Sequence, residues 1–98
     1  GAIVETLGYV TADGVEPIPS GDLPGVPGAW TRLHLEVHTL TLRAALEDSR
    51  QSFIEALSLD PVSGCADFGE LSAMADKLLV ANREWLPRFF PSTPRSAL

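Results

Sequence analysis

Apolar residues in the middle of the chain recur every three or four positions, as they do on one face of an α-helix. The recurring residues are Trp30, Leu33, Val37, Leu40 and Ala44. Pro27-Gly28 comes just before them, and proline is accepted in the first turn of a helix. The pattern predicts a helix over residues 29–47, although the β-branched residues within it favour extended structure.

The first part of the chain has the pattern of a β-hairpin. Residues 3–10 alternate two sets of side chains and are rich in β-forming residues, which predicts a strand. Asp13-Gly14 then offers the positive φ values that a tight hairpin turn uses. Residues 15–19 can form at most an edge strand, because Pro17 and Pro19 cannot donate to a ladder.

The segment from Pro17 to Gly28 is rich in proline and glycine, and we interpret it as an extended surface connection. A phosphate-binding loop needs free backbone N–H groups, which prolines lack. The glycine spacing also fits neither nucleotide-binding fingerprint, so no nucleotide site is expected in this loop.

A second, shorter helix is predicted after a break at Asp48-Ser49. Its apolar residues are Phe53, Ile54 and Leu57. The helix must stop before Asp60-Pro61, since proline disfavours helical backbone in the residue that precedes it. Residues 62–66 then form a connection that holds Cys65, which we interpret as a small inert apolar residue because no histidine lies near it in sequence to lower its pKa.

The last helix has the clearest start in the chain. Asp67 is followed three positions later by Glu70, the pattern of a capping box. The apolar residues behind it at helical spacing are Leu71, Met74, Ala75, Leu78 and Leu79. Trp85-Leu86 continue the same side, and Pro87 closes the helix. The rest of the chain is proline-rich and is predicted to be extended, with Phe89 and Phe90 as its anchors.

These elements predict an α+β fold, mainly helical, with about three helices and a short N-terminal β-hairpin or edge strand pair. A chain of 98 residues fits one small domain, which we place at residues 1–90, followed by a tail at 91–98. The stripes on the long helix and on the last helix leave further apolar groups without cover. We therefore expect a homo-oligomer with a two-fold contact between helices.

Charge, hydropathy and cysteine content restrict the partners and the cellular compartment that we expect. A net charge of −6 with scattered Lys and Arg argues against a nucleic-acid partner. No apolar run approaches the ~18 residues of a membrane span, so no membrane partner is expected. The single Cys65 rules out an internal disulfide and fits a reducing compartment, which we take to be the cytoplasm. The chain opens GAIVETLG, without methionine or a basic start, so we expect no secretory leader and allow for a piece of a longer chain.

One stretch, HLEVH, raises the question of a metal site. His34 and His38 share a face whether the backbone is a strand or a helix, while Glu36 joins them only on a strand. A zinc site needs three or four ligands, and the spacing is not the HExxH of metalloproteases. A solvated or interfacial face is the alternative to a metal-binding pair. By residue chemistry alone, the sequence does not indicate an activity.

Three segments taken in order resemble the C-terminal region of the family 4 glycoside hydrolases. They read VETLGYVTADGVEPIPSGDLP, LTLRAALEDSRQSFIEALSLDPV and NREWLPRF. The family has a Val-Glu strand, a glycine turn, an Ile/Leu-Pro and a Gly-x-Leu-Pro step, followed by a long helix and a final Asp-Pro. The resemblance is nearest the α-glucosidase and α-galactosidase branch and covers nearly all of residues 3–90. It implies the C-terminal part of a lactate-dehydrogenase-like C-terminal domain.

The resemblance implies an enzyme that uses bound NAD⁺ to oxidise a sugar hydroxyl and a divalent metal, usually Mn²⁺, to polarise the resulting ketone. A base removes the neighbouring proton, the aglycone is eliminated, water adds, and the hydride returns. The family places its dinucleotide fold, its metal-binding Cys and His and its tyrosine base upstream of this segment. The resemblance therefore implies no catalytic, cofactor-binding or metal-binding residue here, and neither Tyr9 nor Cys65 takes the family's roles.

The chain departs from the family where HLEVH lies. The family commonly has Gln-Glu before the Leu-Thr pair, whereas this chain has His38-Thr39, so any role of that glutamate is not carried over. We interpret HLEVH as one turn of a structural helix.

Two functions remain open. One is a C-terminal fragment of an NAD- and Mn²⁺-dependent glycosidase, inactive alone, with the remainder of the enzyme and its carbohydrate substrate as partners. The other is a stand-alone acidic helical module for interaction or dimerisation. A Rossmann fingerprint upstream would support the first, and an initiator methionine just before Ala2 the second.

Overall fold

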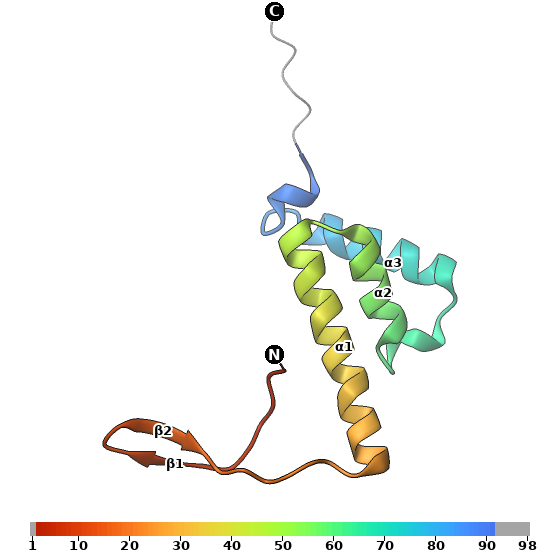
Figure 1. Ribbon diagram of the computed structural model, residues 1–98. Helices are drawn as coiled ribbons and strands as arrows, with labels where there is room; N and C mark the ends of the chain where they lie inside the picture. The colour runs from red at the N-terminus through yellow and green to blue at the C-terminus, as the bar shows by residue number, and fades with distance from the viewer. Residues whose placement is uncertain (1, 92–98) are drawn as a thin grey trace, which may run out of the picture. The chain divides into compact units, whose positions relative to one another are not determined.

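The computed structural model describes residues 2–91. The elements in chain order are β1 (Gly8–Thr11), β2 (Gly14–Pro17), α1 (Gly25–Glu47), α2 (Arg50–Leu59) and α3 (Phe68–Ala81), with 3₁₀ turns at Ser63–Cys65 and Pro87–Phe89 (Figure 1). Three helices follow a two-stranded antiparallel sheet, which confirms the predicted α+β class. The chain divides into two compact units, Gly1–Leu35 and Glu36–Leu98, and each is described by itself.

The hairpin of the first unit is shorter than predicted. β1 pairs with β2 in the register Tyr9↔Glu16 and Val10↔Val15, and the last bond before the strands part runs from Ile18 N to Leu7 O at 2.8 Å. The expected strand at 3–10 is wrong in its bounds, because only Gly8–Thr11 has a partner strand, Gly14–Pro17, to pair with.

The hairpin turn also differs from the expected geometry. Thr11 and Gly14 face each other across the turn, and Gly14 alone of the Asp13-Gly14 pair has a positive φ, at +122°. A single left-handed position is what a type I turn followed by a glycine bulge requires. Thr11 supports the turn, since its Oγ1 accepts from Asp13 N at 3.1 Å.

Helix α1 begins at Gly25, four residues before the predicted start at 29. Gly28 N donates to Pro24 O at 3.0 Å, so Pro27 lies inside the first turn, where its missing N–H costs nothing. The threonines that favour a strand are accommodated by bonding back along the helix, from Thr31 Oγ1 to Pro27 O and from Thr41 Oγ1 to Val37 O.

The predicted break between the first two helices is confirmed. Asp48 has a left-handed backbone with φ 54°, and Ser49 then caps α2 by accepting from Ser52 N at 3.1 Å. Helix α2 ends at Leu59, and the Asp60 carboxylate accepts from Val62 N at 2.8 Å to start the connection. Gly64 lies in this connection with Ser58 O only 2.5 Å from where a Cβ would be, so no side chain fits there.

Helix α3 starts as predicted and ends earlier. Both halves of the capping box form: Asp67 Oδ1 accepts from Glu70 N at 2.8 Å, and Glu70 Oε2 accepts from Asp67 N at 3.1 Å. The helix stops at Ala81, not at Leu86. The side-chain amide of Asn82 donates to Leu78 O, and the residues that follow form turns.

The end of the chain departs from the extended prediction. Residues Pro87–Phe89 form a 3₁₀ turn, in which Phe90 N donates to Pro87 O at 3.2 Å. The prediction of an extended tail at 91–98 lies, except for Pro91, outside the described residues.

The buried side chains all belong to the second unit. Its apolar core comprises Ala44, Ile54, Ala56, Leu71, Ala75 and Leu79. These come from the last turn of α1 and from one side each of α2 and α3, where apolar residues recur at helical spacing. The apolar side chains of the hairpin, by contrast, are exposed.

Candidate functional site

The HLEVH stretch lies on α1, as predicted, and the side chains of His34, Glu36 and His38 are exposed. Within residues 2–91 no three or more His, Cys, Asp or Glu side chains gather closely enough to hold a metal ion. A structural or catalytic zinc site takes at least three protein ligands, and this stretch of α1 offers two histidines.

Cys65 ends the 3₁₀ turn between α2 and α3. Its side chain is exposed, and its thiol donates to Val62 O at 3.2 Å.

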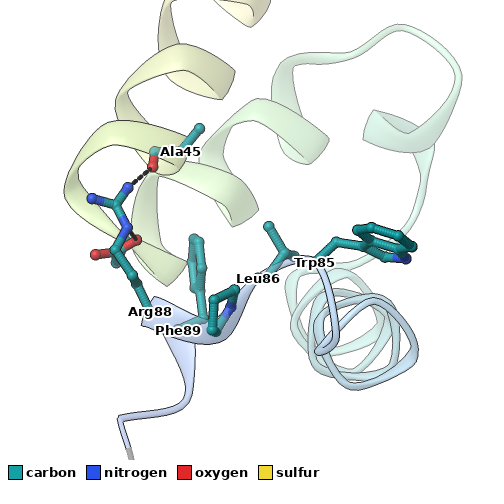
Figure 2. A pocket seen from close by; sticks show the side chains of 7 residues that line it. Ala45, Trp85, Leu86, Arg88 and Phe89 are labelled. Carbon is teal, nitrogen blue, oxygen red and sulfur yellow. Dashed lines mark hydrogen bonds and ion pairs between the residues drawn. The ribbon is translucent and has the colours of Figure 1, made fainter.

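A pocket of about 330 Å³ lies between the last turn of α1 and the segment that follows α3. It is lined by Ala45, Asp48, Trp85, Leu86, Pro87, Arg88 and Phe89. Figure 2 shows Arg88 reaching back to Ala45, while the Trp85 ring lies on the far side of the pocket. The lining is apolar except for one carboxylate and one guanidinium.

Arg88 organises this pocket by joining two distant parts of the second unit. Its Nη2 donates to Ala45 O at 2.7 Å, and its Nε lies 3.1 Å from Asp48 Oδ1. The carbonyls at a helix C-terminus lack intrahelical partners and carry partial negative charge, so a guanidinium there is doubly favoured. Arg88 thus closes the end of α1, a role that the sequence analysis missed when it assigned only Phe89 and Phe90 as anchors.

Phe90 has a neighbour of its own, since the guanidinium carbon of Arg83 lies 5.8 Å from its ring centroid. A cation over an aromatic face contributes modestly at an exposed site. Phe90, which the sequence predicted as an anchor, thus lies beside a cation from the turn after α3.

The chemistry available in this pocket is limited by its lining. Asp48 and Arg88 neutralise each other, and the lining contains no imidazole, thiol or hydroxyl group. General acid–base work needs a group with a pKa near the working pH, and nucleophilic work needs a nucleophile beside a base. We describe the pocket as a contact at which the segment after α3 packs against the end of α1.

A second ion pair holds α2 against α3. Arg50 Nε donates to Asp76 Oδ1 at 2.7 Å and Arg50 Nη2 to Asp76 Oδ2 at 2.9 Å, and Nη2 also donates to Ser72 Oγ. The hydrogen bond from Arg50 holds the pKa of Asp76 below its ordinary value of 3.8, and the same bond raises the pKa of the Arg50 guanidinium. Both side chains are exposed, so solvent screens the interaction.

This pair predicts a stability contribution that depends on pH. Because the folded pKa of Asp76 is depressed, the contribution is present above the unfolded pKa of about 4 and is lost as pH falls through the lower folded value. We expect the coupling between Arg50→Gln and Asp76→Asn to be favourable near pH 7 and absent near pH 2. Urea unfolding of the four proteins of this double-mutant cycle measures it.

The control for this cycle is Glu84→Gln, which removes an exposed carboxylate in the turn after α3. Its coupling to Arg50→Gln should be near zero at both pH values. An Arg50–Asp76 coupling that stays the same near pH 2 would show that the pair acts by packing and not by charge.

No helix among the described residues is both long and apolar enough to cross a bilayer. Comparison with solved structures finds no match. Among curated proteins, the alpha-galacturonidase of Lachnoclostridium phytofermentans is 30% identical over 88 residues, which cover 89% of this chain and 19% of the relative. The chain thus spans about a fifth of the length of the curated relative that it matches.

Comparison of the chain with protein families agrees with the resemblance found in the three sequence segments. The family described as family 4 glycosyl hydrolase C-terminal domain matches residues 1–63, which include the hairpin, α1 and α2. The match covers well over half of the chain and ends just before α3. The chain therefore belongs to family 4 of the glycosyl hydrolases, and what it represents is the C-terminal domain of that family.

Proposed function

We propose that this chain is the C-terminal structural and oligomerisation piece of a glycosidase that hydrolyses O-glycosidic bonds by NAD-dependent oxidation and elimination. The segment itself contributes no catalytic group. Residues 1–90 act as one domain when the rest of the enzyme is present. The observation that carries this proposal is the family match over residues 1–63 combined with the exposure of apolar side chains in the same part of the chain.

That exposure is extensive. Among the described residues from 2 to 43, Gly28 is the only one that is buried. The large apolar side chains left exposed there are Ile3, Val4, Leu7, Tyr9, Val10, Val15, Ile18, Leu23, Val26, Trp30 and Leu42. Single exposed apolar residues are ordinary, but exposed apolar side chains in this number support a cover supplied by another polypeptide. The remainder of a longer glycosidase chain supplies such a cover.

The described residues do not fit the cofactors of the proposed reaction. No cluster of three metal-ligating side chains is present for Mn²⁺ among residues 2–91. The loop before α1 contains Pro19 and Pro24, which offer no N–H to a pyrophosphate, and Asp22, which would repel one. We therefore assign NAD⁺ and Mn²⁺ to the part of the enzyme that precedes this segment in the family.

The substrate belongs to the part of the enzyme that this segment supports. The relative is an alpha-galacturonidase, whereas the sequence resemblance is nearest the α-glucosidase and α-galactosidase branch. We propose an α-linked hexoside or hexuronide as the substrate class, a role in carbohydrate metabolism and a cytoplasmic location. The reducing compartment is supported by the exposed, unpaired Cys65.

The alternative function is a stand-alone acidic module for interaction or dimerisation. One observation favours this alternative. The end of α1 forms a small core with α2 and α3, and that core can form without another chain. The two functions differ in what happens to the first unit, which has no buried side chain of its own.

The catalytic part of the proposal predicts that the isolated chain hydrolyses no aryl glycoside, even when NAD⁺, Mn²⁺ and a reductant are supplied. The assay follows release of nitrophenol from α-glucoside, α-galactoside and α-galacturonide substrates. The alpha-galacturonidase of Lachnoclostridium phytofermentans, assayed under the same conditions on the galacturonide, is the positive control.

Turnover by the isolated chain above a protein-free control would overturn the non-catalytic assignment. If that turnover were lost on adding a chelator and in His34→Ala and His38→Ala, a metal role for these histidines would replace it. A second assay tests the glycosidase assignment itself: the chain is exchanged for the matching segment of the alpha-galacturonidase. Retained turnover supports a shared structural role, and a folded but inactive chimera argues for the module.

A further inference from the structure

Helix α1 ends in a conformation in which glycine is the usual residue. Ser49 N donates to Ala44 O at 3.1 Å, five residues back, which is the outer bond of a Schellman motif. The residue before the donor in this motif has a left-handed backbone, and here it is Asp48, with φ 54°. Aspartate tolerates this region better than most residues, but its Cβ still makes the position unfavourable relative to glycine. A contact that offsets this cost is therefore expected at Asp48.

Arg88 supplies such a contact from the segment after α3. We define the strap as residues 83–90 and the cap as Asp48 and Ser49. Arg88 Nε lies 3.1 Å from Asp48 Oδ1, and Arg88 Nη2 donates to Ala45 O at 2.7 Å (Figure 2). Ala45 belongs to the last turn of α1. One guanidinium thus holds both the side chain of the left-handed residue and a carbonyl of the turn before it, which stabilises this end of the helix.

The rest of the strap is held mostly by bonds within itself and to the end of α3. Its backbone hydrogen bonds each span three residues, as from Trp85 N to Asn82 O and from Phe90 N to Pro87 O. No residue of the strap is buried in the described structure. A segment with few buried apolar contacts opens at a lower free energy than the core of the same domain. The strap is therefore expected to open locally, and the two Arg88 bonds break when it does.

We propose that the strap and the cap form one conformational unit, in which Arg88 holds the left-handed end of α1 closed and both parts open together before the helical core unfolds. Arg88 then acts as a positioning residue, because it sets the connection between α1 and α2 through Asp48. A contact that displaces the strap from the pocket would release this connection as well. The device belongs to the second unit and is independent of the proposed function.

Native-state hydrogen exchange on the 98-residue chain tests the shared opening. The amides of Ser49, Trp85 and Phe90 each donate a backbone hydrogen bond, so their exchange reports the opening of the cap and of the strap. At urea concentrations below the unfolding transition, these three amides are expected to share one opening free energy. That value should be lower than the value for Leu79, which lies in the buried core.

Arg88→Gln tests the part that the guanidinium plays. The substitution removes one charged hydrogen bond and one exposed ion pair, so exchange of the cap amide and of the strap amides should become about three- to tenfold faster. Exchange at Leu79 should change by less than about twofold. Arg43→Gln removes an exposed arginine from α1 and is the matched control, which should leave all of these amides unchanged.

Asp48→Gly separates coupling from simple loosening of the strap. Glycine adopts a φ of 54° without strain, so the end of α1 no longer depends on Arg88. In this background, Arg88→Gln should change exchange at Ser49 by less than about twofold. The strap amides should still exchange faster, because the bond to Ala45 is lost.

Faster exchange of the strap amides in Arg88→Gln, with Ser49 unchanged, would show that the strap frays alone and would overturn the coupling. An equal acceleration at Leu79 would show global unfolding, and no acceleration at all would show that the Arg88 bonds contribute nothing, so either result would overturn the shared local opening. An effect on Ser49 that persists in the Asp48→Gly background would overturn the role of Asp48. If Arg88→Gln does not fold, the parent chain decides, since different opening free energies for the cap and the strap contradict a single unit.

Discussion

Ile54→Ala is expected to destabilise the second unit by about 2–5 kcal/mol, because it leaves a cavity where a large side chain is removed from a packed site. Ile54 is the largest fully buried side chain of the described chain, at 1% exposure. A chain of this length has a total stability of only ~5–15 kcal/mol, so the variant loses a large fraction of it and should unfold at a lower urea concentration. Urea unfolding followed by far-ultraviolet circular dichroism measures the loss.

The matched control is Val62→Ala in the connection after α2, where the side chain is 84% exposed. Its removal should change the free energy of unfolding by less than about 0.5 kcal/mol. Equal effects of the two substitutions would show that Ile54 is not in a packed core, and the helical unit described above would then be wrong.

Ala75→Leu is expected to destabilise the same core by about 1–3 kcal/mol through overpacking. Ala75 on α3 is fully buried, at 0% exposure, between the apolar residues of α2 and α3. A larger side chain there must push the two helices apart or adopt a strained rotamer. The measurement is again the free energy of unfolding, together with the near-ultraviolet signal that reports side-chain packing.

Ala73→Leu makes the same chemical change on the same helix at an exposed position. Because alanine and leucine have nearly equal helix propensity, Ala73→Leu should be close to neutral. If Ala75→Leu were neutral as well, or stabilising, the space between α2 and α3 would be larger than the structure shows. The Arg50–Asp76 pair at the rim of that contact would then have to be reassessed.

The contrast between the two units bears on the proposed function. The second unit has a core in which single substitutions should be costly, whereas the first unit has no buried side chain to substitute. Under the proposed function, the rest of the enzyme covers the apolar side chains that the first unit exposes.

The sequence by itself determined the elements whose signals are local. Asp67 and Glu70 start α3 through contacts three residues apart, and Ser49 starts α2 in the same way. The helical repeat from Trp30 to Ala44 identified α1 correctly in spite of its β-branched residues, since each threonine hydroxyl finds its partner one turn away. These interactions depend only on neighbours along the chain, so their pattern is visible in the residues.

Tertiary structure decided the features that join distant residues. Arg88 closes the end of α1 from 43 positions away, and no local pattern marks it as different from the other arginines. Trp85 continues the α3 stripe in sequence, yet it is exposed because Asn82 ends the helix first. The shortness of β1 depends on where its partner strand ends. Such features depend on contacts between segments that are far apart in sequence. These contacts form only when the chain folds, so no local sequence pattern indicates them.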